Sequence, residues 1–266
     1  MYLSIVSALL LFGFPFIKTD VVDSFSKCSQ FFLEGKPPVI PDILKDSAAQ
    51  NSNRYKLICQ QYQNAVRFAT LYDTTNKIPT FSAYKYTGKG NFTKPHSRFR
   101  IETELKDDQA KNSDYRNNIQ MTRGHLFPSG HAVDLDTAKS TFTLTNAVPQ
   151  EKTFNEVTWN QKKNNFKTHM DNNCINVNNK VEAYVVTGVI PGDKKLNDKV
   201  NIPSHMWMAY CCYNKNTGLW DTKAYCGTNE EKSTAAFNGE SLAALQNFLK
   251  EKLKKNNVQL FQNKCK

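Results

Sequence analysis

The pattern of hydrophobic and polar positions predicts several short strands. Residues 54–86 mix Val, Phe, Tyr and Thr with an Asp-Thr-Thr-Asn break and an Ile-Pro break, which is typical of strands joined by turns. Two apolar runs, 181–190 and 206–213, predict buried strands. Residues 141–146 place threonine at every second position, opposite Phe, Leu and Asn, which predicts a half-buried strand that is stopped by Pro149.

Helices are predicted in two later segments. From Phe154 to about Met170 the pattern changes towards a helix, with Phe166 and Met170 four residues apart. Residues 241–253 place leucines and a phenylalanine on one side of a helix. No internal repeat or long linker divides the chain. Because strands and helices are mixed without βαβ order, we expect the α+β class.

The first residues are almost wholly apolar. The run from Tyr2 to Ile17 fits the hydrophobic core of a secretory signal peptide better than a membrane span, which needs about 20 apolar residues. We therefore expect a signal peptide over residues 1–22, a domain over residues 25–266, and a secreted, extracellular protein. The alternative is a buried N-terminal helix. No later stretch is apolar enough to predict a membrane span.

Seven cysteines follow this segment. In a secreted chain they predict two or three disulfides, with one thiol left over, although the pairing cannot be derived from the sequence. Cys211 and Cys212 are adjacent on a predicted strand, so they point to opposite faces and should have different partners. Zinc is the competing interpretation, but no CxxC pair is present. The sequon at Asn91 predicts N-glycosylation.

The formal net charge of +11 suits a polyanionic partner, either nucleic acid or an acidic membrane surface. The lysines are spread along the chain, and their densest group lies at residues 250–255 on the predicted C-terminal helix. Such a cluster is typical of a solvated helix face. The charge alone therefore does not identify the partner.

Residues 121–131 read MTRGHLFPSGH and contain side chains suited to phosphodiester hydrolysis. That reaction needs a base that takes a proton from water and a cation that stabilises charge on the phosphate. His125 can be the base, because the pKa of an imidazole is about 6.5 and the ring is therefore largely neutral at neutral pH. Arg123 can hold a phosphate by a forked contact. Asn155 offers a carbonyl oxygen to a hard cation such as Mg²⁺, and Gly124 permits a close backbone approach.

The spacing of these residues resembles the DNA/RNA non-specific endonucleases, which have the ββα-metal, or His-Me finger, fold. More narrowly, the chain is similar to the secreted endonuclease domain-containing 1 group of vertebrates. The resemblance rests on Arg123-Gly124-His125-Leu126, Pro128, Asn146, Pro149-Gln150, Asn155 and Trp159. It implies a mixed central sheet flanked by helices. It also implies a Mg²⁺-dependent, sequence-non-specific endonuclease that binds DNA and RNA through phosphates, with Mn²⁺ as a substitute ion.

The resemblance also implies roles for single residues. His125 would be the general base, Arg123 would engage the phosphate, Asn155 would be the direct metal ligand, and Asn146 would support the site. His131, in the loop after the motif, is expected to be structural. Nothing in the sequence sets the oligomeric state or the preference between DNA and RNA.

Two positions depart from the family pattern. The motif's leading Asp is Thr122, and the family's acidic residue on the metal helix, eight positions after Asn155, is Lys163. At about 100° per residue, Lys162 and Lys163 both lie near Asn155, so we expect both lysines to bind substrate phosphates. The departures motivate a second hypothesis, a weakened or inactive member that binds nucleic acid or another extracellular partner. A small-molecule phosphodiesterase is a third.

Overall fold

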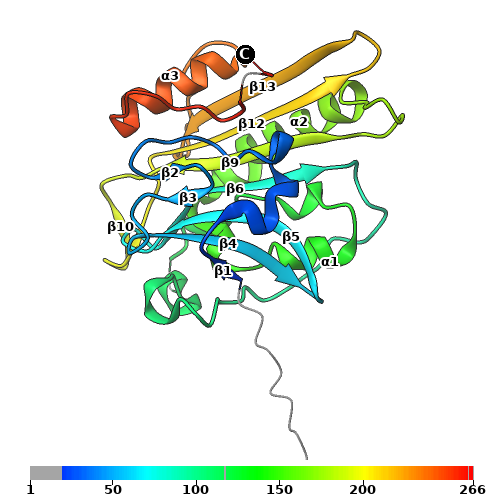
Figure 1. The fold of residues 1–266 in the computed structure, drawn as a ribbon. Coiled ribbons are helices and arrows are strands. Elements are labelled where there is room, and N and C mark those ends of the chain that lie inside the picture. Colours follow the sequence, from blue (N-terminus) through cyan, green and yellow to red (C-terminus); the bar gives the residue numbers. More distant parts are fainter. Residues whose placement is uncertain (1–19, 117, 263, 266) are drawn as a thin grey trace, which may run out of the picture.

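The centre of the protein is a seven-stranded antiparallel sheet (Figure 1). The structure, a computed structural model, describes residues 20–116, 118–262 and 264–265. Most of the expected signal segment, residues 1–19, lies outside the described residues. Val21 and Val22, at its predicted end, pair with Ile58 and Leu57 at the edge of the sheet. In sheet order the strands are β1 (Val21–Val22), β4 (Tyr55–Tyr62), β5 (Ala65–Asp73), β6 (Ile78–Tyr86), β9 (Ala183–Ile190), β12 (His205–Asn214) and β13 (Leu219–Thr228).

The α+β class is confirmed, but the expectation of a mixed central sheet is wrong. Every neighbouring pair of its strands is antiparallel. The physical reason is the short connections: β4–β5, β5–β6 and β12–β13 are hairpins, and a tight turn can join only antiparallel strands. The longest excursion, residues 87–182 between β6 and β9, also returns the chain antiparallel.

The connections between the strands of the sheet and the C-terminal segment supply the remaining elements. Three α-helices are described, namely α1 (Leu135–Ser140), α2 (Asn160–Asn173) and α3 (Leu242–Leu253). The π-helix η7 (Phe154–Trp159) leads directly into α2. Two-stranded ribbons are formed by β7 (Met121–His125) with β8 (Ala147–Glu151), β2 (Leu44–Lys45) with β3 (Ala48–Ala49), and β10 (Lys195–Leu196) with β11 (Val200–Asn201). The 3-10 helices are η1 (Phe25–Phe31), η2 (Leu33–Gly35), η3 (Lys106–Asp108), η4 (Asn112–Tyr115), η5 (Ser129–His131) and η6 (Leu144–Asn146).

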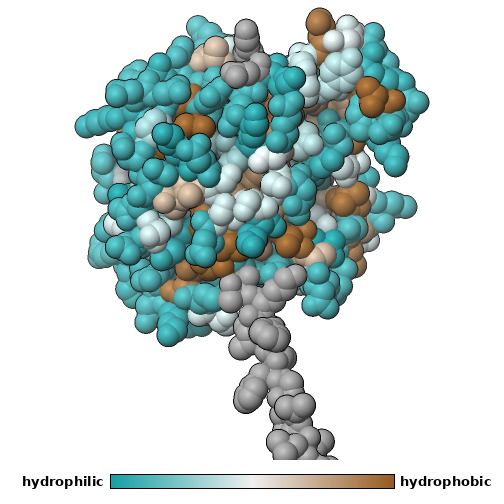
Figure 2. Space-filling view, in the orientation of Figure 1, coloured by the Kyte–Doolittle hydropathy of each residue, from teal (hydrophilic) through white to brown (hydrophobic). Residues whose placement is uncertain are grey.

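The sheet separates two hydrophobic cores. Adjacent residues on a strand face opposite sides, so Val185 packs with α2 while Val186 packs with α3 and η1. The predicted helices over 154–170 and 241–253 are confirmed as η7–α2 and α3. The surface shown in Figure 2 is mostly hydrophilic, with hydrophobic residues in smaller patches. None of the helices among the described residues has both the length and the apolar character needed to cross a bilayer.

The half-buried strand predicted over residues 141–146 is wrong. This segment is coil and the 3-10 turn η6, and all six side chains are buried. Its alternating threonines reflect a buried polar network, because the hydroxyls of Thr143 and Thr145 donate to Glu102 Oε1 at 2.7 and 3.3 Å. The strand begins after the segment, as β8, and contains Pro149. Proline is tolerated there because β8 belongs to a two-stranded ribbon.

Three disulfides are formed, Cys28–Cys59, Cys174–Cys212 and Cys211–Cys265. Cys226 is a buried free thiol. The predicted number of bridges and the separate partners of Cys211 and Cys212 are therefore confirmed. The second bridge ties the end of α2 to β12, and the third ties the C-terminal segment to the opposite face of β12.

Alkylation of the non-reduced protein should reveal one reactive cysteine, Cys226, and only after denaturation. Burial shields the thiol and raises its pKa to about 12, so little thiolate forms in the folded protein. Iodoacetamide labelling followed by peptide mass spectrometry checks this, with reduced, denatured protein as the control in which all seven cysteines react. A disulfide-linked peptide that contains Cys226 would contradict the structure.

Candidate active site

Strand β7, the segments 94–98 and 128–131, and the η7–α2 helix line a cavity of about 890 Å³. In the ribbon, Arg123 lies opposite Pro149 and His125 lies opposite Ala147. The cavity brings together four residues that the sequence singled out: Arg123, His125, Asn155 and Lys163. They come from segments up to 40 positions apart, and only the packing of the helix on the ribbon unites them.

His125 ends β7, and its ring lies between two aromatic side chains. The ring centroids of Phe99 and Phe142 are 5.0 and 4.7 Å from that of His125. Burial, reinforced by the charges of Lys163 and Lys94, lowers the pKa of His125 to about 3. Its Nε2 atom is buried and has no hydrogen-bond partner among the described residues. A neutral imidazole with an unpartnered nitrogen can accept a proton from water.

Arg123 is held by aromatic rings and by one backbone carbonyl. Its guanidinium carbon lies 4.9 Å from the ring centroid of Tyr115 and 5.7 Å from that of Phe99. Nη2 donates to the carbonyl oxygen of Asn112 at 3.2 Å. Nε is buried and has no partner within the described part of the chain. The side chain is therefore positioned, yet it keeps donors for a phosphate.

Asn155 is oriented by the hydroxyl that replaces the motif's carboxylate. Its Nδ2 donates to Thr122 Oγ1 at 3.0 Å, and that hydroxyl donates to the carbonyl oxygen of Gln150 at 3.1 Å. Because the amide nitrogen is occupied, Oδ1 is the atom of this side chain that can bind a cation. A neutral carbonyl oxygen is a ligand that Mg²⁺ accepts, so the residues fit a hard cation.

The two lysines that follow the π-helix η7 are placed differently from one another. The sequence predicts that Lys162 and Lys163 both lie near Asn155. Lys163 lines the cavity, whereas Lys162 does not. The Lys162 Nζ atom lies 3.6 Å from Glu240 Oε1 and 4.5 Å from the centroid of the Tyr225 ring. Binding of a substrate phosphate by Lys162 therefore gains no support from the cavity lining and stays a prediction.

Gly124 lies where a side chain of β8 packs closely on the backbone of β7. A Cβ atom at this position would lie 1.9 Å from Gln150 Oε1 and 2.6 Å from Gln150 Cβ. The side chain of Gln150 thus fills the space over the glycine. The close approach expected at Gly124 is the contact between β7 and β8 itself.

Asn146 fixes the chain just after His125. Its Oδ1 accepts hydrogen bonds from the Phe127 backbone N–H and the Ser82 hydroxyl, both at 2.9 Å. Its Nδ2 donates to the carbonyl oxygens of Phe127 and Thr141 at 3.1 and 3.0 Å. This fully buried amide joins the exit of β7 to β6 of the central sheet. It supports the site without facing the cavity.

His131 lines the cavity, but both of its ring nitrogens are engaged. Nε2 donates to the backbone carbonyl oxygen of Lys163 at 3.1 Å, so Nδ1 accepts from the Tyr84 hydroxyl at 2.9 Å. Burial lowers the pKa of His131 to about 4, which keeps the ring neutral. The residue links β6 to α2, in agreement with the structural role expected for it.

The loop before β7 contributes residues that the sequence reasoning missed. Lys94, His96 and Arg98 line the cavity. They lie on no predicted element and in no motif. The available signal was the density of basic residues between β6 and β7, where residues 87–100 contain four lysines and arginines and one histidine.

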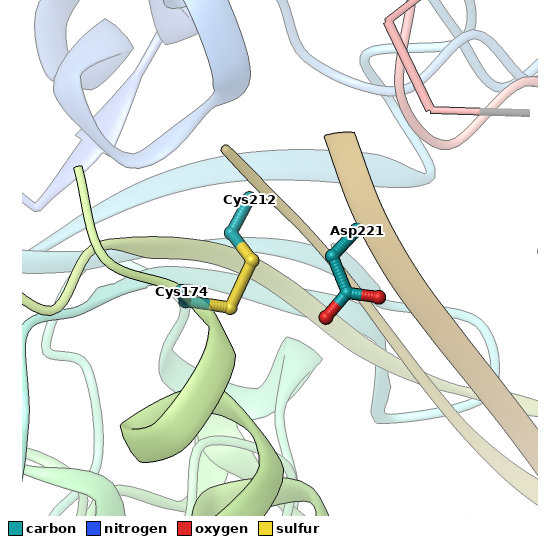
Figure 3. Close-up of side chains that lie close together, drawn as sticks. All are labelled: Cys174, Cys212 and Asp221. Carbon is teal, nitrogen blue, oxygen red and sulfur yellow. A yellow bond between two sulfur atoms is a disulfide. The ribbon is translucent and has the colours of Figure 1, made fainter. Parts of the chain in front are cut away.

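The remaining sequence expectations fall outside this cavity. Asn91 is exposed in a loop, as a glycosylated asparagine must be. The alternative interpretation of the cysteines is a zinc site. Among the described residues, one group of possible metal ligands is present: Cys174, Cys212 and Asp221, with ligand atoms within 4.8 Å of one another (Figure 3). Both sulfur atoms are joined in a disulfide, so no thiolate is offered to a metal.

Two strands followed by a helix, with His on the first strand and Asn at the start of the helix, point to one family. The model of the DNA/RNA non-specific endonuclease family matches residues 46–264. The chain belongs to this family. A chain in the crystal structure of the EndoG/EndoGI complex is similar in fold, with a TM-score of 0.58 and 16% identity, covering 73% of this chain and 83% of that one. The ββα-metal fold expected from the sequence is thereby confirmed.

Two relatives in the family are similar in sequence. The human endonuclease domain-containing 1 protein is 28% identical over 91% of this chain and 48% of its own length. The mouse protein of the same name is 29% identical over 71% of this chain and 39% of its own length. The chain therefore spans about half, or less, of the length of these relatives.

Replacing Gly124 with Ala should destabilise the protein by about 1–3 kcal/mol, because the added methyl group displaces Gln150 from the ribbon. Gly130→Ala is the matched control: Gly130 also lines the cavity, but a Cβ there meets nothing within 4 Å. Urea unfolding of both variants measures the difference. Equal free energies of unfolding for the two variants would show that the ribbon is less tightly packed than described.

Proposed function

We propose that this chain is a secreted, Mg²⁺-dependent endonuclease that hydrolyses DNA and RNA without sequence specificity. The observation that carries the proposal is the neutral His125, with an unpartnered Nε2, in one cavity with Arg123 and the cation-binding oxygen of Asn155. Nucleases of this family are metal-dependent as a class. The hard amide oxygen of Asn155 supports the choice of Mg²⁺, with Mn²⁺ as a substitute.

In the proposed reaction, His125 removes a proton from a water molecule as the water oxygen attacks phosphorus. The bond from phosphorus to the leaving sugar oxygen breaks, and solvent protonates that oxygen. Arg123 holds the non-bridging oxygens and stabilises the charge that develops on them. A divalent cation on Asn155 would supply further charge stabilisation. A base placed in this way contributes a factor of about 10² to 10⁴ in rate.

Contacts to phosphates alone explain a lack of sequence specificity, because phosphates carry no base information. The cavity wall offers Lys94, Arg98, Arg123 and Lys163 for such contacts. Binding should therefore weaken steeply as the salt concentration rises. We include Lys163 among the substrate-binding residues and leave out Lys162, whose amino group lies against Glu240 and Tyr225.

Secretion is part of the same proposal. Three disulfides fit an oxidising compartment. We place a signal peptide within residues 1–22, the endonuclease domain over 25–266, and a glycan on Asn91.

The rival function is an inactive member that binds nucleic acid or another extracellular partner. It rests on Thr122 and Lys163, where the family pattern has acids. The hydrogen bond from Asn155 to Thr122 favours catalysis over this rival, because the hydroxyl still orients the amide.

The purified secreted protein should nick supercoiled plasmid in Mg²⁺ and not in EDTA, and His125→Ala should lower the rate by about 10² or more, since it removes the base. His205→Gln is the control, because His205 is half-buried at the start of β12 and does not line the cavity. Gel electrophoresis of plasmid over time measures the rate. Salt-sensitive binding of DNA with no cleavage, across metals and pH, would favour the inactive binder.

Thr122→Val should lower the nicking rate by about 10- to 100-fold, as is typical when a residue that orients a ligand side chain is lost. Valine keeps the shape of threonine but cannot accept the hydrogen bond from Asn155. Thr122→Ser keeps the hydroxyl and should retain most activity. Mn²⁺ affinity, measured by electron paramagnetic resonance, should fall in the Val variant and recover in the Ser variant. Equal affinity in both would exclude the positioning role.

A further inference from the structure

The wall of the cavity is strongly cationic before any ligand binds. Its lining residues include the cations Lys94, Arg98, Arg123 and Lys163, and only one carboxylate, the exposed Glu156. Most lysines and arginines on a protein surface face mixed charges. Here an entering ion meets positive charge on several sides.

Lys94 and Lys163 lack the partners that would neutralise them. Among the described residues, neither amino group forms an ion pair with a carboxylate. Both lysines line the same cavity, and burial together with the charge of Lys94 lowers the pKa of Lys163 to about 8. Both lysines also act on His125, whose pKa they lower. The two charges thus converge on the centre of the site.

The charges of this cavity disfavour the binding of a free cation and favour the binding of an anion. A divalent cation that arrives alone finds the neutral oxygen Asn155 Oδ1, a single carboxylate at the exposed Glu156, and repulsion from the ammonium groups of Lys94 and Lys163. A hard cation gives up its hydration water reluctantly without anionic oxygens. A phosphate that arrives alone can bind the guanidinium group of Arg123 and the ammonium groups of Lys94 and Lys163, which are side-chain groups well suited to phosphate.

On the basis of the proposed function, we propose that a phosphate group enters this cavity before the divalent cation, and that the cation binds as a metal–phosphate pair. The bound phosphate supplies the anionic oxygens that Asn155 lacks and offsets the charges of Lys94 and Lys163. Coupling between binding sites is reciprocal, so phosphate raises the affinity for the cation by the same factor as the cation raises the affinity for phosphate. The resting protein is therefore an anion site, and metal loading depends on substrate.

The test measures Mn²⁺ binding to the full secreted protein at pH 7, by electron paramagnetic resonance, with and without inorganic phosphate. A protein-free titration corrects for Mn²⁺–phosphate pairs in solution. Phosphate binding is measured separately by calorimetry in EDTA. We expect phosphate to bind without metal, and to raise the Mn²⁺ affinity by about 10-fold, within the range of typical couplings.

Lys163→Gln and Lys94→Gln each remove one charge from the cavity. Each should weaken phosphate binding in EDTA, strengthen Mn²⁺ binding in the absence of phosphate, and so reduce the coupling. Lys180→Gln is the matched control, because it removes the same charge from an exposed position outside the cavity. Thermal melting shows that the variants are folded. Asn155→Ala should abolish Mn²⁺ binding in both conditions, which assigns the ion to this cavity.

Two outcomes would overturn the proposal: Mn²⁺ binding that is as tight without phosphate as with it, and no Mn²⁺ binding under either condition. Plasmid nicking separates this result from the proposed function. Metal-dependent nicking without coupling would support the proposed nuclease activity and contradict only the proposed order of binding. Coupled binding without nicking would support the proposed order of binding and contradict the proposed nuclease activity.

Discussion

The antiparallel pairing of β7 with β8 is the constraint on which the site depends. Gly124 lets the Gln150 side chain lie directly over the β7 backbone, at a distance that no side chain on residue 124 would permit. The same pairing places the Gln150 carbonyl within reach of Thr122, which in turn holds Asn155. One close contact between strands therefore sets the position of the base at the end of β7 and the orientation of the cation ligand on the next helix.

The ribbon is held in place by buried amides and a histidine rather than by charge. Asn146 joins the end of β7 to β6 with four hydrogen bonds, and His131 joins β6 to α2. Each polar atom in these links has a partner, so their burial carries little penalty. Around them the large antiparallel sheet and the Cys174–Cys212 bridge fix both ends of the long excursion. The excursion can therefore carry irregular segments without losing its geometry.

Burial and charge act together on the chemistry of the cavity. The aromatic rings of Phe99 and Phe142 help to bury the ring of His125, and the ammonium groups of Lys94 and Lys163 oppose its protonation. The same charges that keep the base neutral attract phosphate. Where the family pattern places an acid, the chain has a lysine that lines the wall. The site thus retains its base and its ligand, while the balance between anion and cation binding moves towards the anion.

The sequence by itself determined the elements with strong local signals. Long apolar runs identified β9 and β12, and helical periodicity identified α2 and α3, because burial on one face leaves a repeat in the chain. The motif around Arg123 and His125 and its spacing to Asn155 were sufficient to name the family and the candidate base. Only the tertiary structure decided what depends on neighbours distant in the chain. The buried network around Glu102 turned an apparent strand at 141–146 into a turn, and the amino group of Lys162 lies against Glu240 and Tyr225 rather than in the cavity. Lys94 and Arg98 joined the site through a loop whose path no local pattern encodes.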